Sequence, residues 1–241
     1  MLICAIDTSG REGSVALAEG DAASFQVLHV AAIEGGTYSA QLIPQISSGL
    51  QRCGRAKTEI GLLVAAAGPG SFTGLRVGLS TVKALSEVLQ IPIAGVSVLE
   101  AIAFATGNLG LVLAALDAQR NEVFVGEYEI QPASGDFTVR SRAVEEALVG
   151  ASDFITWVSA RKDSPVTYTP DVTIESRVRE SGATVELVRR PGAEIYARAG
   201  WNKFLAGETI MAEALDANYI RRSDAEIFSA PKLGTGQNRR R

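Results

Sequence analysis

The order of apolar runs and helical patterns between residues 2 and 106 constrains the fold more than any other feature. Three short strand patterns separated by tight turns are followed by helix, strand, helix, strand and helix patterns. Tight turns join antiparallel strands, whereas strand–helix–strand units join parallel ones. We therefore expect an α/β protein with a mixed sheet. The expected elements are strands at 2–6, 14–19, 23–30, 62–67 and 93–96, and helices at 39–53, 71–89 and 97–106.

This order is that of a ribonuclease H-like domain, and the pattern partly restarts at Leu111. We expect two tandem ribonuclease H-like domains of the actin-like ATPase (ASKHA) superfamily, the second of them reduced. The first domain is expected at 1–106, the second at 107–192, a helix that packs back on the first domain at 193–206, and a flexible tail at 223–241. In the second domain the expected elements are strands at 111–117, 122–130, 137–142 and 154–159, and a helix at 143–150.

Composition and charge exclude several classes of protein. The chain has 241 residues, 46% of them hydrophobic, which is enough for a buried core. Its 23 basic and 27 acidic residues give a net charge of −4, whereas a chain that binds nucleic acid by itself usually has more basic than acidic residues. Cys4 and Cys53 form neither a disulfide framework nor a zinc site, and no signal peptide or membrane span is apparent. We expect a cytoplasmic protein.

Residues 67–78 read AGPGSFTGLRVG and suggest a phosphate loop at first sight. The stretch lacks the Gly-Lys pair of a P-loop, and Thr73 stands where a dinucleotide fingerprint has its third glycine. We interpret it as a turn made by Gly68 and Gly70, with Ser71 capping the helix that follows. Anion binding by the free N–H groups of residues 71–73 is the alternative.

Catalytic signals are weak. The only histidine is His29, within a strand pattern, so paired-histidine metal motifs are excluded and a Ser-His-Asp triad has little support. Asp7 and Asp117 end matching strands, where actin-like ATPases hold magnesium and phosphate. The adenosine Gly-Gly loop of those enzymes is missing, and we favour a role for both carboxylates in orienting loops. We expect no catalytic residue, cofactor or metal; an ATP-dependent actin-like enzyme or a glycoprotease-like peptidase is the alternative.

Several stretches together resemble the TsaB (YeaZ) family from Leu2 to about Arg222: ICAIDTSGREGSVAL, YSAQLIPQI, GPGSFTGLRVG, DAQRNEVF and NYIRR. The resemblance implies a non-catalytic subunit that pairs with a catalytic paralogue, TsaD, and is joined by the ATPase TsaE. The complex forms threonylcarbamoyl-adenosine next to the anticodon of tRNAs that read codons starting with A. Contact with tRNA is implied only through the complex, and a homodimer is possible when the chain is alone. Tyr38 stands where the family usually has histidine.

For the partner surface we expect the first two helices, with Gly74 and Gly78 lowering the profile of the second and Arg76 reaching across the interface. The alternative is that Leu42, Ile46 and Leu50 only cover the chain's own sheet. The candidate partner-binding residues are Tyr38, Leu42, Gln45, Ile46, Phe72, Gly74, Leu75, Arg76, Gly78 and Leu79.

Overall fold

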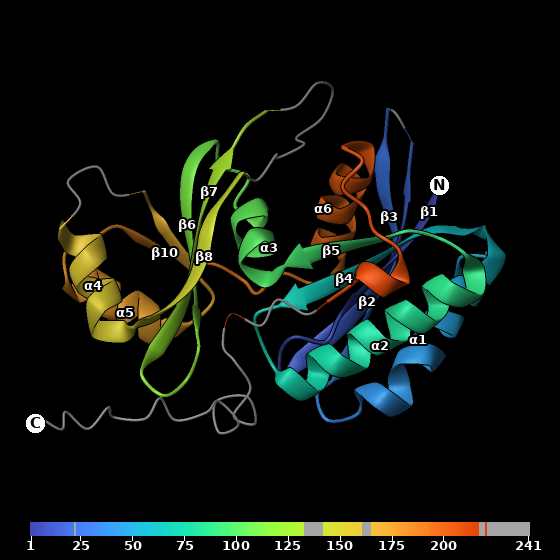
Figure 1. Ribbon diagram of the computed structural model, residues 1–241, viewed down its shortest axis with the longest axis horizontal. Coiled ribbons are helices and arrows are strands. Elements are labelled where there is room, and N and C mark those ends of the chain that lie inside the picture. The colour runs from blue at the N-terminus through green and yellow to red at the C-terminus, as the bar shows by residue number, and fades with distance from the viewer. Residues whose placement is uncertain (22, 133–141, 161–164, 217–219, 221–241) are drawn as a thin grey trace, which may run out of the picture.

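The computed structural model describes residues 1–21, 23–132, 142–160, 165–216 and 220. The tail expected at 223–241 and nearly all of the strand expected at 137–142 lie outside these residues. Within the described residues, two sheets and six α-helices stack in five layers (Figure 1): α1 and α2, the first sheet, α3 with α6, the second sheet, and α4 with α5.

The first sheet has the strand order β3-β2-β1-β4-β5. β1 pairs antiparallel with β2 and parallel with β4, as the tight turns and the helical crossovers predict. This is the ribonuclease H-like topology, so the expected fold class is confirmed. Its strands are β1 (Leu2–Asp7), β2 (Glu12–Gly20), β3 (Phe25–Glu34), β4 (Ile60–Gly68) and β5 (Ile93–Ser97).

The second sheet repeats the topology of the first. Its order is β10-β9-β6-β7-β8, in which β6 pairs antiparallel with β7 and parallel with β9. Read from β8, this order matches that of the first sheet strand for strand, which confirms the duplication. The strands are β6 (Gly110–Asp117), β7 (Glu122–Ile130), β8 (Arg142–Gly150), β9 (Thr167–Thr169) and β10 (Val185–Leu187).

The helices expected in the first half are present, with ends shifted by at most one residue. Ser71 and Ser97 cap α2 and α3 with their side chains, as their positions predict. The late helix expected from 193 is α6, which packs on the first sheet. The helices are α1 (Tyr38–Arg52), α2 (Phe72–Leu89), α3 (Val98–Ala105), α4 (Ala151–Ala160), α5 (Val172–Glu180) and α6 (Ala193–Leu205), with 3-10 turns at Lys57–Glu59 and Ala212–Ala214.

The predictions for 143–159 are wrong. Residues 143–150 form part of strand β8, although their Ala, Glu and Leu content favours a helix, and residues 154–159 lie in helix α4. β8 pairs with β7 and places Leu148 against one core and Val149 against another, so pairing and burial override the helix propensity. In α4, Phe154 and Val158 are buried at helical spacing, a pattern that the aromatic and β-branched residues conceal.

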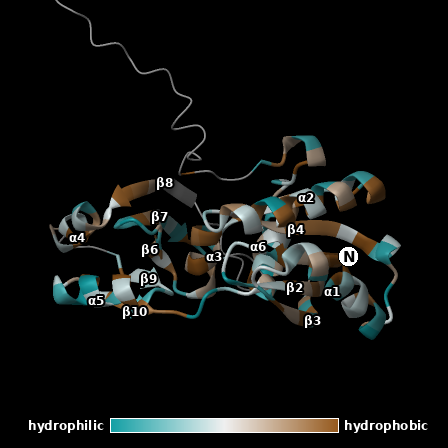
Figure 2. Cartoon of the chain, turned by 90° about the horizontal axis from the view of Figure 1, so that it is seen from below, coloured by the Kyte–Doolittle hydropathy of each residue, from teal (hydrophilic) through white to brown (hydrophobic). Residues whose placement is uncertain are grey.

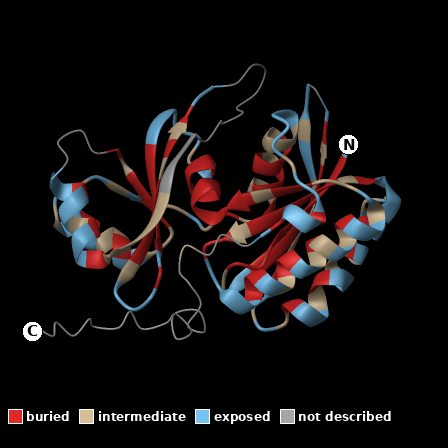
Figure 3. Ribbon diagram, viewed as in Figure 1, coloured by how far each residue is buried: buried red, intermediate tan, exposed pale blue. Residues whose placement is uncertain are grey.

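One hydrophobic core joins the two sheets. It contains residues such as Val64 and Val96 of the first sheet, Val112 and Tyr128 of the second, and both α3 and α6 between them. Figure 3 shows this buried interior between the sheets, while the outer sides of α1, α2, α4 and α5 are exposed. Two further cores lie under α1 and α2 and under α4 and α5. The sheets are therefore fixed relative to one another by packing.

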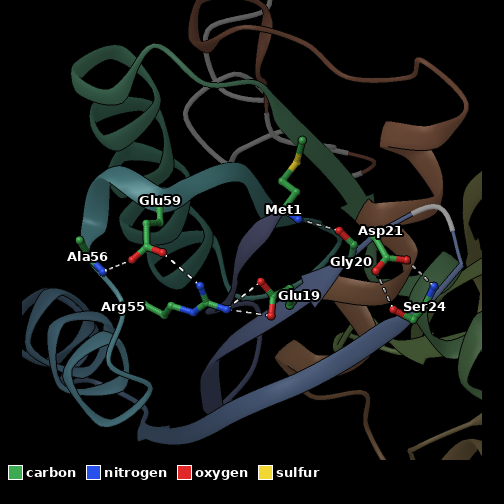
Figure 4. Close-up of polar contacts among 8 residues, drawn as sticks. All are labelled: Met1, Glu19, Gly20, Asp21, Ser24, Arg55, Ala56 and Glu59. Carbon is green, nitrogen blue, oxygen red and sulfur yellow. Dashed lines mark hydrogen bonds and ion pairs between the residues drawn. The ribbon is translucent and has the colours of Figure 1, made fainter.

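Surface contacts hold the connection between α1 and β4. The Nη2 atom of Arg55 lies 2.7 Å from a carboxylate oxygen of Glu19 on β2, and its Nη1 atom lies 3.1 Å from Glu59 (Figure 4). Glu59 in turn accepts a hydrogen bond from the N–H of Ala56. All three charged side chains are partly exposed, so water screens both pairs and they add little to stability.

Apolar residues are concentrated in the strands and on the inner sides of the helices (Figure 2). Within the described residues, no helix combines the length and the apolar character that a membrane crossing requires.

Candidate functional site

Most of the expected contact residues on α1 and α2 are buried in this chain. The side chains of four of them lie against the first sheet in the core that includes Cys4, Ile6 and Leu63; these are Tyr38, Leu42, Ile46 and Leu79. This agrees with the alternative that the stripe of α1 covers its own sheet. The buried candidates are Tyr38, Leu42, Ile46, Gly74, Leu75, Gly78 and Leu79.

The expectation that Gly74 and Gly78 form an open surface is wrong. A Cβ atom on Gly74 would lie 2.0 Å from the carbonyl oxygen of Thr8, and one on Gly78 would lie 2.3 Å from Thr8 Oγ1. The Thr8 hydroxyl also donates a hydrogen bond of 2.7 Å to the Gly74 carbonyl. Both glycines therefore permit a close approach between α2 and the end of β1 inside the first domain.

Three candidate residues remain accessible on the outer side of the helices. Phe72 is 38% exposed, and the guanidinium carbon of Arg76 lies 3.8 Å from the centre of its ring. Gln45 on α1 is half-buried. Ile43 and Pro44, which the candidate residues do not include, are exposed as well, Ile43 to 51%. An isoleucine outside the buried stripe of an amphipathic helix was the available signal.

The Gly-rich stretch is packed as a turn. The N–H of Ser71 donates to the carbonyl of Ser9 at 2.8 Å, and a Cβ atom on Gly70 would lie 2.3 Å from the same oxygen. The N–H of Ser71, one of the three groups that an anion would use, is thus engaged within the chain, and Ser71 Oγ accepts from the N–H of Gly74. The geometry favours the turn interpretation over the phosphate loop.

Asp7 orients the turn that follows β1. The residue is 2% exposed, and its carboxylate accepts hydrogen bonds from the N–H of Ser9 at 2.8 Å and from Ser9 Oγ at 2.6 Å. Burial raises the pKa of Asp7, while the Ser9 hydrogen bonds and the charge of Arg190 oppose the rise. Nη2 of Arg190 also donates to Ser9 Oγ at 3.2 Å. Ser9 and Arg190 thus lie next to this carboxylate as polar neighbours.

Asp117 has the matching role in the second domain. Its carboxylate accepts from both the N–H and the side-chain amide of Gln119, at 2.8 and 2.7 Å. Its own N–H donates to Asp171 at 2.7 Å. Burial raises the pKa of Asp171, while the positive charge of Arg190 opposes the rise. Both strand-end carboxylates therefore fix loops, as expected.

Tyr38 fills space between the turn after β1 and the start of α2. Its side chain is buried, and its hydroxyl donates to the Gly10 carbonyl at 2.9 Å. Burial, and secondarily the negative charge of Asp7, raise the pKa of Tyr38 to about 12, so the phenol is neutral at physiological pH. The residue at this position acts here as a packing and hydrogen-bonding group.

Within the described residues, no three His, Cys, Asp or Glu side chains lie close enough together to hold a metal ion. The ring of His29 on β3 lies against Gly49 of α1, where a Cβ atom would be 2.8 Å from the imidazole. The expectation that the chain is not an enzyme stays a prediction.

Comparison with known proteins identifies the family. Residues 34–162, more than half of the chain, match the family model described as TsaD, tRNA N6-adenosine threonylcarbamoyltransferase. The "tRNA threonylcarbamoyladenosine biosynthesis protein TsaB" of Bacillus subtilis is 29% identical, over 94% of this chain and 96% of that protein. The chain belongs to this family, in its TsaB (YeaZ) branch. The Haemophilus influenzae TsaB is 25% identical over 92% of this chain and 94% of its own length.

Solved structures of TsaB-type proteins share the fold. YeaZ from Pseudomonas aeruginosa superimposes with a TM-score of 0.70 at 23% identity, covering 90% of this chain and all of that one. A protein described as uncharacterised, with similarity to peptidase YeaZ from Pseudomonas aeruginosa, gives a TM-score of 0.74 at 25% identity, with 91% and 99% covered. Both sheets of this TsaB-type chain therefore belong to the shared architecture.

Proposed function

We propose that this TsaB-type chain acts in the biosynthesis of threonylcarbamoyl-adenosine in tRNA, as a subunit without catalysis of its own. It binds the catalytic paralogue, a TsaD-type protein, and a TsaE-type ATPase joins the complex. Its contact with tRNA is through the complex. The observation that carries the partner role is the outer side of α1 and α2, where Ile43 and Phe72 are exposed.

The chemistry of this surface suits a protein interface. Phe72 and Arg76 form a preassembled cation–π pair, and aromatic residues and arginine are enriched where protein interfaces bury most of their energy. The Leu42 and Ile46 stripe anchors α1 to the sheet, so the exposed residues are held on a rigid support. A rigid apolar surface loses little side-chain entropy on binding.

The non-catalytic part of the proposal rests on Asp7. In an actin-like ATPase a carboxylate at this position would have to hold a metal ion or phosphate-bound water. Here Asp7 is buried and accepts two hydrogen bonds from Ser9, and Arg190 lies beside them. These contacts support a structural role for the carboxylate rather than a metal-binding one.

The test is association of the purified chain with the TsaD-type paralogue from the same organism, measured by calorimetry and size-exclusion chromatography. We expect Ile43→Arg to weaken binding at least tenfold, since it buries an unpaired charge at the interface. The matched control is Val88→Arg, because Val88 is 77% exposed at the far end of α2. Both variants should keep the melting temperature of the parent. Equal binding by both variants would contradict the proposed surface, and ATP hydrolysis by the isolated chain would favour the enzyme alternative.

The biosynthetic role has its own readout. In a reconstituted reaction that contains the TsaD-type and TsaE-type proteins, threonylcarbamoyl-adenosine in tRNA is measured by mass spectrometry. Formation of the modified nucleoside should depend on this chain and fall with Ile43→Arg. Unchanged yield without the chain would contradict its part in the pathway.

A further inference from the structure

The turn after β1 holds the start of α2. The Thr8 hydroxyl donates a hydrogen bond to the Gly74 carbonyl at 2.7 Å, and the Ser9 carbonyl accepts one from the N–H of Ser71 at 2.8 Å. Ser71 is the N-cap residue of α2, and Phe72 is the first residue of the helix. The direction in which α2 begins, and with it the position of the exposed Phe72, therefore depends on this turn.

The same turn holds the start of α1. The Gly10 carbonyl accepts a hydrogen bond of 2.9 Å from the hydroxyl of Tyr38, which is the first residue of α1. Ile43, the exposed apolar residue of α1, follows in the second turn of the helix. Both helices of the proposed partner surface thus begin on the three consecutive residues 8–10.

A segment fixed to both domains passes behind this turn. It runs from β10 of the second sheet to α6, which packs on the first sheet (Figure 1). At its beginning the N–H of Val188 donates to the Thr169 carbonyl of β9 at 2.9 Å, and at its end the N–H of Ala193 donates to Ser14 Oγ of β2 at 2.8 Å. Arg190 lies between these two anchored ends, so its backbone is held by both domains.

The guanidinium of Arg190 contacts the turn directly. Its Nη2 atom donates to Ser9 Oγ at 3.2 Å, and a Cβ atom on Gly10 would lie 3.0 Å from its Nε atom. Its charge opposes the rise in the pKa of Asp7 in the first domain and of Asp171 in the second. Arg190 therefore lies against the turn and within electrostatic reach of a carboxylate in each domain.

The Ser9 hydroxyl transmits this contact to Asp7. Ser9 Oγ donates a hydrogen bond of 2.6 Å to the Asp7 carboxylate and accepts the one from Arg190, so the two contacts fix the orientation of one hydroxyl. Asp7 is 2% exposed, and a buried carboxylate that loses a nearby cation is destabilised. Because Asp7 also accepts from the N–H of Ser9, removal of the guanidinium should change how the backbone of the turn is held.

We propose that Arg190 is a positioning residue for the partner surface: it supports the turn of residues 8–10 and so fixes the starts of α1 and α2 for binding. The second domain, which contributes no residue to that surface, affects the affinity for the partner through this contact. The inference rests on the proposed function for its effect on binding, whereas the support of the turn is a property of the isolated chain.

The first test uses the isolated, full-length chain and the hydrogen exchange of the Ser71 amide, measured by NMR. Arg190→Met keeps a long side chain but removes the charge and the donors, and exchange at Ser71 should become about tenfold faster. Arg190→Lys restores a cation and a donor and should recover most of the protection. The matched control is Arg189→Met, because Arg189 is the exposed neighbour in the same segment and should leave the exchange unchanged.

The amide of Val64, in the core strand β4, separates local support from global stability. Its exchange should not change in Arg190→Met. Parent-like exchange at Ser71 in this variant would overturn the proposal. An equal acceleration at Ser71 and Val64, or failure of Arg190→Lys to recover protection, would also overturn it, since Arg190 would then serve only the stability of the whole fold.

The second test is the affinity for the TsaD-type partner, measured by calorimetry. Arg190→Met should weaken binding about tenfold, and Arg189→Met should change it by less than about twofold. Ser9→Ala removes the acceptor of the Arg190 contact, so the double variant Arg190→Met/Ser9→Ala should bind no more weakly than the weaker single variant. Losses that multiply would overturn the proposed route through Ser9.

The two tests separate this inference from the proposed function. Unchanged affinity in Arg190→Met, despite faster exchange at Ser71, would overturn the effect on the partner surface. Absence of binding by the parent chain would instead contradict the proposed function, and the exchange at Ser71 would still decide whether Arg190 supports the turn.

Discussion

At the scale of single residues, the contact between Thr8 and α2 explains two glycines that sequence patterns assign to a surface. Thr8 is 2% exposed, and its carbonyl and hydroxyl occupy the positions where side chains at Gly74 and Gly78 would lie. The spacing of four residues puts both glycines on one side of the helix, but it does not say which way that side points. The glycines serve packing inside the chain.

Replacing Gly78 by leucine should therefore destabilise the isolated protein. A Cβ atom alone would be 2.3 Å from Thr8 Oγ1, so the helix must move away from β1, at a cost of about 1–3 kcal/mol in the free energy of unfolding. Ser80→Leu, on the exposed side of α2, should cost less than about 0.5 kcal/mol. Urea unfolding of both variants measures these free energies. A Gly78→Leu protein as stable as the parent would show that this contact is loose.

At the scale of elements, the start of α3 links local capping to tertiary structure. Ser97 Oγ accepts from the N–H of Leu99 at 3.2 Å, and Glu100 accepts from the N–H of Ser97 at 3.4 Å, which together form a capping box. Glu100 also pairs with Lys203 of α6 at 3.2 Å. The cap thus stabilises the helix and connects it to its neighbour within the central layer.

The two helix caps should differ in their contribution to stability. Ser97 is buried and Ser71 is exposed, so removal of the Ser97 hydroxyl leaves an N–H group without access to water. We expect Ser97→Ala to lower the free energy of unfolding by about 1–2 kcal/mol and Ser71→Ala by about 0.5–1 kcal/mol. Chemical denaturation of the two single variants measures the difference. An equal or larger loss for Ser71→Ala would refute the argument from burial.

At the scale of the whole molecule, α3 and α6 are shared between the two sheets. Tyr196 of α6 and Ile102 of α3 belong to the same core as Val64 of the first sheet and Tyr128 of the second. Neither sheet can expose its inner face without disrupting the contacts of the other. We therefore expect the two domains to unfold together.

The two tryptophans report on different parts of the molecule, one on the second domain and the other on the central layer. Trp157 is on α4 at one end of the molecule, and Trp201 is buried on α6 in the central layer. In Trp157→Phe and in Trp201→Phe, the fluorescence of the remaining tryptophan should give the same urea midpoint as the far-UV circular dichroism of that variant. Because each variant is its own reference, a loss of stability on mutation does not affect the comparison. Separate midpoints would show domains that unfold independently.

The sequence by itself determined the fold class and most of the first domain. Strand and helix patterns between residues 2 and 106 are long, strongly periodic and bounded by caps such as Ser71 and Ser97, so local physics is sufficient there. The roles of Asp7 and Asp117 as holders of loops also follow from their positions at strand ends, and the hydrogen bonds agree. Periodicity failed at 143–159, where strand pairing outweighs residue propensity.

Only the tertiary structure decided which faces are covered. A helical pattern gives a buried stripe and its opposite side, but Gly74, Gly78 and Tyr38 are enclosed by Thr8 and the turn after β1, segments distant in the sequence. A hollow of about 260 Å³ in the second domain is likewise formed by three separate segments, within residues 117–123, 151–155 and 173–177. Burial is a property of the whole packed chain, because each surface is covered or left open by residues that local sequence cannot specify.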